Sequence, residues 1–126
     1  MKRVIAALLV ISVVGVVAIL HIHKAKSLTE SVIDVADRVF IEYNNKSRDG
    51  ILENLDRISE IWDENHMWAH LTMSTRQIDE IEISLAQSRA YCEAEAWDNF
   101  AGEFTMFCML IEHIEKQETF SWGELL

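Results

Sequence analysis

Several residue types are scarce in this chain of 126 residues, and each scarcity excludes a class of protein. Proline is absent and glycine occurs only four times, which argues against an all-β fold because such folds depend on tight turns. Two cysteines are too few for a disulfide scaffold or a four-thiolate metal site. Basic residues number 11 against 21 acidic ones, so the net charge of −10 disfavours binding to the phosphates of nucleic acids. The hydrophobic share of 50% excludes a disordered acidic tail.

The charges are divided unevenly along the chain. Residues 1–26 carry four basic and no acidic side chains, a net charge of +4, whereas residues 27–126 carry 7 basic and 21 acidic ones, a net charge of −14. Between the basic flanks, Val4 to Ile22 forms a run of 19 residues without Asp, Glu, Lys or Arg. Such a helix spans roughly 28 Å, close to the ~30 Å of a bilayer's hydrocarbon core. The sequence therefore predicts a membrane anchor in residues 1–26 and an acidic domain in residues 27–126.

We expect this anchor to be retained as a signal anchor. A cleaved signal peptide has an apolar core of roughly 7–15 residues and a small-residue cleavage site, whereas this run is longer and is followed by His23-Lys24-Ala25-Lys26. Lys2 and Arg3 nearly balance Lys24 and Lys26, so the positive-inside rule discriminates weakly between the two orientations. Because long domains translocate largely regardless of charge, we expect a cytoplasmic N-terminus and an extracytoplasmic domain.

Apolar residues after Ser27 recur at helical spacing in four segments, each of which would bury one face. The fold class expected is all-α: the transmembrane helix continues into a small four-helix bundle of two αα-hairpins, with a short C-terminal tail from Gln117. The apolar stripes are Leu28, Val32, Val35, Val39 and Tyr43; Ile51/Leu52, Leu55, Ile58 and Trp62; Ile78, Ile81, Leu85, Ser88 and Cys92; Phe100/Ala101, Phe104, Phe107/Cys108, Ile111 and Ile114; and, in the tail, Phe120, Trp122, Leu125 and Leu126.

Polar residues mark the ends of these helices. Asn44-Asn45 would stop the first helix, which runs on from the anchor without a breaker. The expected N-caps are Ser47 or Asp49 for the second helix, Ser74 with Gln77 as a capping box for the third, and Asp98 for the fourth. An offset of 49 residues places Val32 on Ile81 and Asp49 on Asp98. This offset fits either a worn duplication stacked like a solenoid or unrelated amphipathic helices of similar length.

Several short patterns in the helical region resemble a known family. They are Asp49 before the second helix, Trp62 late in it, Ile81-x-Ile83-Ser84-Leu85, Leu110-Ile111-Glu112-His113-Ile114 and Glu118. Together with the basic start and the single span, they resemble a family of small bacterial single-pass membrane proteins of unknown function, over nearly the whole chain. In that family an aromatic residue often follows the Asp and a His often precedes the third helix, where this chain has Gly50 and Thr75. The resemblance implies a bacterial membrane location and no activity.

Two histidines are candidate metal ligands. His66 and His70 are four residues apart and would share a helix face with Trp62, a spacing at which two imidazoles can hold a transition metal. The alternative is a half-exposed helix end whose aromatic side packs on the core. The chain has no HExxH motif, and no Glu lies three residues before any His, so the di-iron bundle motif is missing.

Sulfur-containing residues suggest two further sites. Met106, Met109 and His113 share a helix face and could suit Cu(I), although methionine at this spacing is more often core or partner surface. Cys92 and Cys108 fall on the predicted inner faces of two neighbouring helices. If the domain lies outside the cell they could form a disulfide, provided that their Cα atoms approach to roughly 4.4–6.8 Å. Otherwise they are small buried residues.

The tryptophans suggest a surface for binding a protein. Trp62, Trp68, Trp97 and Trp122 are more than a small core readily hides, and an aromatic rimmed by acids is typical of a binding hot spot. We therefore take Trp62 and Trp68 as candidate partner contacts. The alternative for Trp68 is packing beneath the irregular stretch before Ser74.

These patterns lead to two functional hypotheses. The first is a non-catalytic protein-interaction or scaffold module at the cell envelope, whose partner would be a protein such as a larger membrane protein. The second is a metal- or ligand-sensing domain that uses His66/His70 or Met106/Met109/His113. An enzyme is not expected, because the sequence contains no nucleophile–base pair, phosphate loop or metal triad. No cofactor is expected either.

Overall fold

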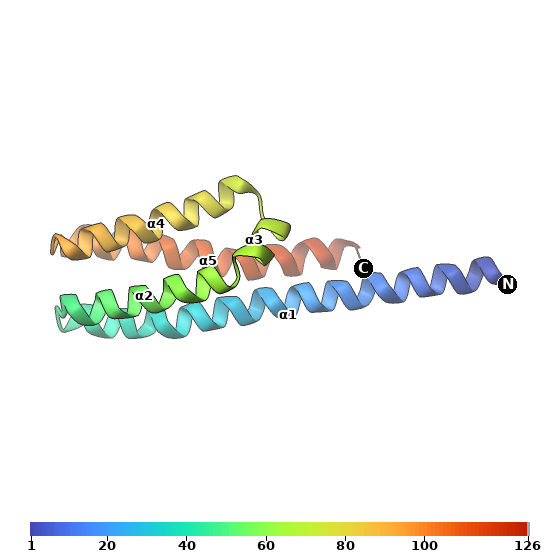
Figure 1. Cartoon of the computed structure of the whole chain (residues 1–126), viewed down its shortest axis with the longest axis horizontal. Coiled ribbons are helices and arrows are strands. Elements are labelled where there is room, and N and C mark those ends of the chain that lie inside the picture. Colours follow the sequence, from blue (N-terminus) through green and yellow to red (C-terminus); the bar gives the residue numbers. More distant parts are fainter. Residues whose placement is uncertain (126) are drawn as a thin grey trace.

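The computed structural model describes residues 1–125, apart from the side chains at 121–123 and 125 (Figure 1). Over that range the chain is all-α and contains no strand, so the predicted fold class is confirmed at this level. The helices are α1 (Lys2–Asn44), α2 (Arg48–Glu64), α3 (His66–Thr72), α4 (Thr75–Glu93) and α5 (Trp97–Leu125). The segment from Gln117, expected as a tail, instead continues α5 as a helix to Leu125. The tail side chains of Trp122, Leu125 and Leu126 lie outside the described residues.

Helix α1 has two parts with different surroundings. Its first part exposes a continuous apolar surface, whereas Leu28, Val32 and Val39 in its second part are buried. The helix is unbroken between them and ends at Asn44, as the sequence predicts. By length and composition α1 could cross a membrane. At 1.5 Å per residue its 43 residues extend about 65 Å, and in Figure 1 its N-terminal end projects well beyond the other helices.

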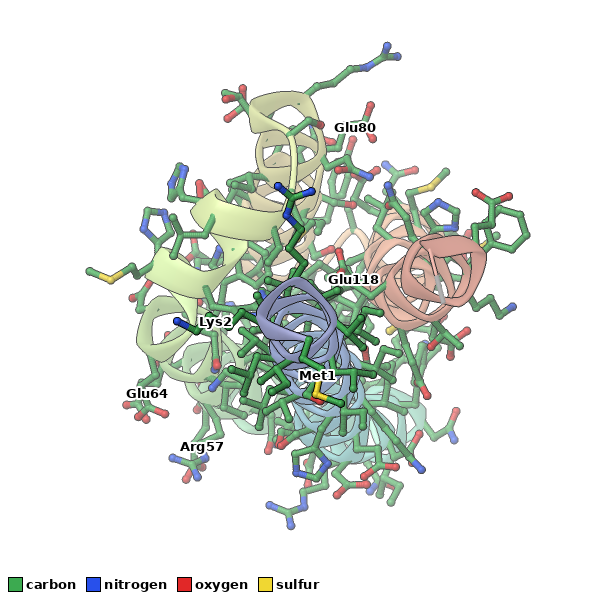
Figure 2. All side chains as sticks on the ribbon, turned by 90° about the vertical axis from the view of Figure 1, so that its right-hand side faces the viewer. Met1, Lys2, Arg57, Glu64, Glu80 and Glu118 are labelled. Atoms are coloured by element: carbon green, nitrogen blue, oxygen red, sulfur yellow. The ribbon has the colours of Figure 1, made fainter. Side chains whose placement is uncertain are left out.

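The four long helices enclose one core. Helix α1 runs antiparallel to α2, and α4 runs antiparallel to α5 (Figure 1). In addition, α1 contacts α5 and α2 contacts α4, so the first and last helices are neighbours. A solenoid-like stack would leave those two helices apart, and this alternative does not describe the structure. The largest fully buried side chains are Phe100, Phe104, Phe107, Ile51, Leu55, Ile58, Ile78, Ile81, Ile111, Val32, Val39 and Cys92. Labelled charged residues such as Arg57, Glu64 and Glu80 point outward (Figure 2).

The turns after α1 and α4 have the same geometry. Each contains one non-glycine residue in the left-handed region, Lys46 at φ 54° and Glu95 at φ 55°. In each, the next backbone N–H reaches back across the helix end, from Ser47 to the Glu42 carbonyl at 3.0 Å and from Ala96 to the Tyr91 carbonyl at 2.9 Å, as in a Schellman motif. Since 95 − 46 = 49, the two turns are related by the offset that aligns the helices in the sequence.

Most of the predicted helix caps are present. The Ser47 hydroxyl accepts a hydrogen bond from the Gly50 N–H, and Ser74 forms the predicted capping box with Gln77. The prediction for Asp98 was wrong. Helix α5 already begins at Trp97, which places Asp98 inside the first turn, where its carboxylate faces the positive end of the helix dipole.

The second predicted helix is interrupted near its end. Helix α2 stops at Glu64, and the short α3 follows after Asn65. The side-chain amide of Asn65 donates a hydrogen bond to the Ile61 carbonyl at 2.7 Å. A side chain thus bonds to a backbone acceptor at the end of the helix. The break lets Ala69 and Trp68 pack against the core. Trp62 and the two candidate metal-ligand histidines therefore do not lie on one continuous helix.

Candidate functional site

A pocket lies where α1 leaves its apolar run and meets α3. It has a volume of about 360 Å³ and is lined by Leu20, His21, His23, Lys24, Ser27 and Trp68; we call it the α1–α3 pocket. Trp68 is partly buried and packs against the core, so this candidate partner contact is held inside the fold beside α1. Its indole Nε1 is buried and has no hydrogen-bond acceptor within the described part of the chain.

The structure brings the two candidate metal ligands together. The Nε2 atoms of His66 and His70 are 3.1 Å apart, with the rings edge to face. Glu82 on α4 joins them, because its Oε1 lies 3.4 Å from His66 Nε2 and accepts a hydrogen bond from Trp62 Nε1 at 3.3 Å. Among residues 1–125, no group of three His, Cys, Asp or Glu side chains is arranged to hold a metal ion. The cluster thus offers two imidazole nitrogens, with a carboxylate beside one of them.

Trp62, the other candidate partner contact, is buried in the structure. Its side chain is only 3% exposed, because it lies on the buried stripe of α2. Its one polar atom is already used by Glu82. Trp97 is partly buried, and its ring packs edge-on against Tyr43 and Phe100 at centroid distances of 6.3 and 6.5 Å. Among the three tryptophans whose side chains the structure describes, one is buried and two are partly buried, so their number alone does not indicate an exposed aromatic surface.

The candidate Cu(I) ligands Met106, Met109 and His113 do not line one common pocket. Met106 and Met109 are 51% and 60% exposed. Met106 lines a hollow of about 370 Å³ between α4 and α5, whereas His113 lines a different one nearer Gln77. The larger hollow, which we call the α4–α5 groove, is lined by Glu80, Ile83, Ser84, Glu103, Met106 and Leu110. The sequence pattern did not indicate this groove, because Ile83 lies off the buried stripe of its own helix.

Both cysteines are free, buried thiols, so no disulfide joins Cys92 to Cys108 in the structure. The Cys92 thiol donates to the Arg48 carbonyl at the start of α2, at 3.8 Å. Burial raises its pKa, and the Arg48 charge partly opposes the shift. Burial also raises the pKa of Cys108 to about 12, with smaller contributions from Glu112 and Asp37. The two thiols therefore have different neighbours, and both are held in the unreactive protonated form.

A second pocket, larger than the α1–α3 pocket, has the opposite character. It lies between α1 and α5 and measures about 720 Å³. Four carboxylates line it, those of Glu30, Asp34, Glu112 and Glu115, together with a single cation, Lys116. This lining disfavours anions, in contrast with the α1–α3 pocket, whose lining residues include no carboxylate.

Comparison with known proteins places the chain in a family. Residues 19–125 match the family described as Domain of unknown function (DUF4363). The match covers most of the sequence, so the chain belongs to this family, in agreement with the resemblance seen in its short patterns. No curated protein matches the chain. No solved structure matches it either.

Proposed function

We propose that this protein is a single-pass, membrane-anchored interaction module. Val4 to Ile22 would form the span, and the four long helices would form a bundle that binds a protein partner without catalysis. The observation that carries the proposal is the division of α1. One part exposes apolar side chains along its whole length, and the other part is buried among α2 and α5. An exposed apolar surface of this length suits lipid and not water.

We further propose that the N-terminus faces the cytoplasm of a bacterial cell and that the bundle is extracytoplasmic. The test uses the full-length chain with a C-terminal tag in intact cells. Protease added outside should remove the tag before lysis, and an alkaline carbonate wash should leave the chain in the membrane. Protection of the tag until lysis would reverse the orientation. Extraction by carbonate would refute the anchor.

The α4–α5 groove is the surface that best suits a protein partner. Ile83 and Met106 are about half exposed on neighbouring helices, and flexible methionine side chains adapt readily to a partner's surface. A photo-crosslinking residue placed at Met106 in cells should give a protein adduct of defined mass, and Ile83→Asp should abolish it. The matched control position is Arg57, which is exposed on α2. Equal adducts from both positions would contradict the assignment.

A second candidate function is binding of a divalent transition metal by His66 and His70. It is favoured by the 3.1 Å separation of their Nε2 atoms, since two nitrogens at that separation can both ligate one ion at about 2.0–2.1 Å. Titration of the full chain with Zn²⁺ or Cu²⁺ should show one site that His70→Ala removes. His113→Ala is the control and should leave binding unchanged. Identical titrations for both variants and the parent would rule this function out.

A further inference from the structure

We propose that the α1–α3 pocket binds the phosphate of an anionic phospholipid headgroup. The proposal rests on the membrane anchoring proposed above, and it adds a ligand to the point where the anchor meets the bundle. Three features of the pocket support it: the donors in its lining, its position along α1, and its mixed apolar and polar walls.

The lining residues provide hydrogen-bond donors of the kind that phosphate oxygens accept. Lys24 is a cation with three donors, Ser27 has a hydroxyl, and His21 and His23 each present a ring that can donate. No carboxylate lines the pocket, although the chain has 21 acidic residues. A lysine close to the membrane surface is attracted to the negative charge of anionic lipid headgroups.

Trp68 supplies a further donor. Its indole N–H is buried, and no acceptor reaches it within the described residues. Buried donors are rarely left unsatisfied in native proteins. A phosphate oxygen entering the pocket would give this group an acceptor close to the lysine. Tryptophan, like tyrosine, is also enriched at the boundary between lipid and water.

The position of the pocket agrees with a lipid and not with a soluble phosphate. Lys24 lies two residues beyond Ile22, about 3 Å along the helix axis from the end of the apolar run. In a membrane-spanning α1, that is the depth at which headgroups begin. Leu20, one turn earlier, contributes an apolar wall on the side facing the run. A headgroup with its acyl chain would use both walls, whereas free phosphate would use only the polar one.

The test compares lipid retention by three full-length chains: the parent, Lys24→Gln and Lys26→Gln. Each is placed in nanodiscs of phosphatidylcholine and phosphatidylglycerol in equal parts, and the lipids that stay bound are measured by native mass spectrometry. Lys26 is exposed and does not line the pocket, so Lys26→Gln removes the same charge at nearly the same depth. We expect Lys24→Gln to weaken phosphatidylglycerol retention about tenfold, as for one hydrogen bond to a charged group. Lys26→Gln should retain as much as the parent.

The other outcomes are equally informative. Equal retention by all three chains would overturn the site, and equal loss in both variants would show diffuse attraction in place of a pocket. A second variant, Trp68→Phe, keeps an aromatic ring and removes the N–H, and it should also reduce retention. If inorganic phosphate binds the detergent-solubilised chain and displaces the lipid, the ligand is free phosphate and the lipid assignment is overturned. The carbonate wash separates the two proposals, since a chain that stays in the membrane but retains no lipid refutes only the pocket.

Discussion

The continuity of α1 predicts that the apolar run and the packed helices move as one rigid body. Spin labels at Val10 and Ile41, both exposed, are 31 residues apart, and a straight helix separates them by about 46 Å. Inserting Gly-Pro between Lys24 and Ala25 would interrupt the helix, because proline cannot continue its hydrogen bonding. The insertion precedes Ala25, the first residue of the main core cluster, so the register of that core is unchanged. A right-angled bend at this point would bring the labels to about 33 Å.

Double electron–electron resonance on the full chain in nanodiscs measures this distance. The native cysteines are replaced by alanine for the labelling. The parent should give a narrow distribution near 46 Å, and an Ala-Ala insertion at the same point should give a narrow one about 3 Å longer, since alanine continues the helix. The Gly-Pro insertion should give a broad, shorter distribution. A broad distribution in the parent would refute the rigid connection. Unchanged crosslinking from the α4–α5 groove after the Gly-Pro insertion would show that partner binding does not depend on it.

Three further predictions concern stability, all measured on the detergent-solubilised full chain. Phe104→Ala should lower the free energy of unfolding by about 3–5 kcal/mol, because the Phe104 ring is fully buried and stacks on Phe100 with the ring centroids 5.5 Å apart. The control is Met106→Ala at a half-exposed position, which should change this free energy by about 0.5 kcal/mol or less. Equal effects of the two substitutions would contradict the assigned core. Glu95→Gly should raise the free energy of unfolding by about 0.5–1 kcal/mol, because glycine adopts the left-handed conformation of this residue without strain. A lower free energy of unfolding in urea denaturation would contradict this account of the turn. Burial raises the pKa of Cys108 from 9.0 to about 12, so above pH 9 the unfolded chain releases a proton that the folded chain keeps, and stability should fall as pH rises toward 12. Cys108→Ala should flatten this fall relative to the parent, and the same slope in both would refute the shift.

The helix ends that could be predicted from the sequence depend on local chemistry. The Ser74 capping box needs only Gln77 three residues later, and α1 continues because no proline or glycine lies in its second half. The buried stripe of α5 was also predictable, since helical spacing alone places Phe100, Phe104 and Phe107 on one face. For such features the signal lies within a few residues of the structure that it specifies.

Features that depend on contacts between helices could not be predicted in this way. The sequence does not set the register of α3 against α4, so nothing in it placed Glu82 beside His66. Asn65 was the only local signal for the end of α2, and asparagine also occurs within helices. The same limit applies to the α1–α3 pocket, because Trp68 lies more than 40 residues from Lys24 in the sequence. Trp68 can be identified from the sequence, but its neighbours in the pocket depend on how α1 and α3 pack together.

The single helix α1 has a consequence for how this protein can be processed. Many anchored proteins carry their folded part on an extended linker, which a protease can cut to release an intact domain. Here the backbone is helical throughout from Lys2 to Asn44, and helical backbone does not fit the extended conformation that proteases bind. A cut beyond Leu28 would also remove part of the core. Between Lys2 and Asn44 the structure therefore offers a protease no extended segment, and we expect the packed helices to remain joined to the apolar segment.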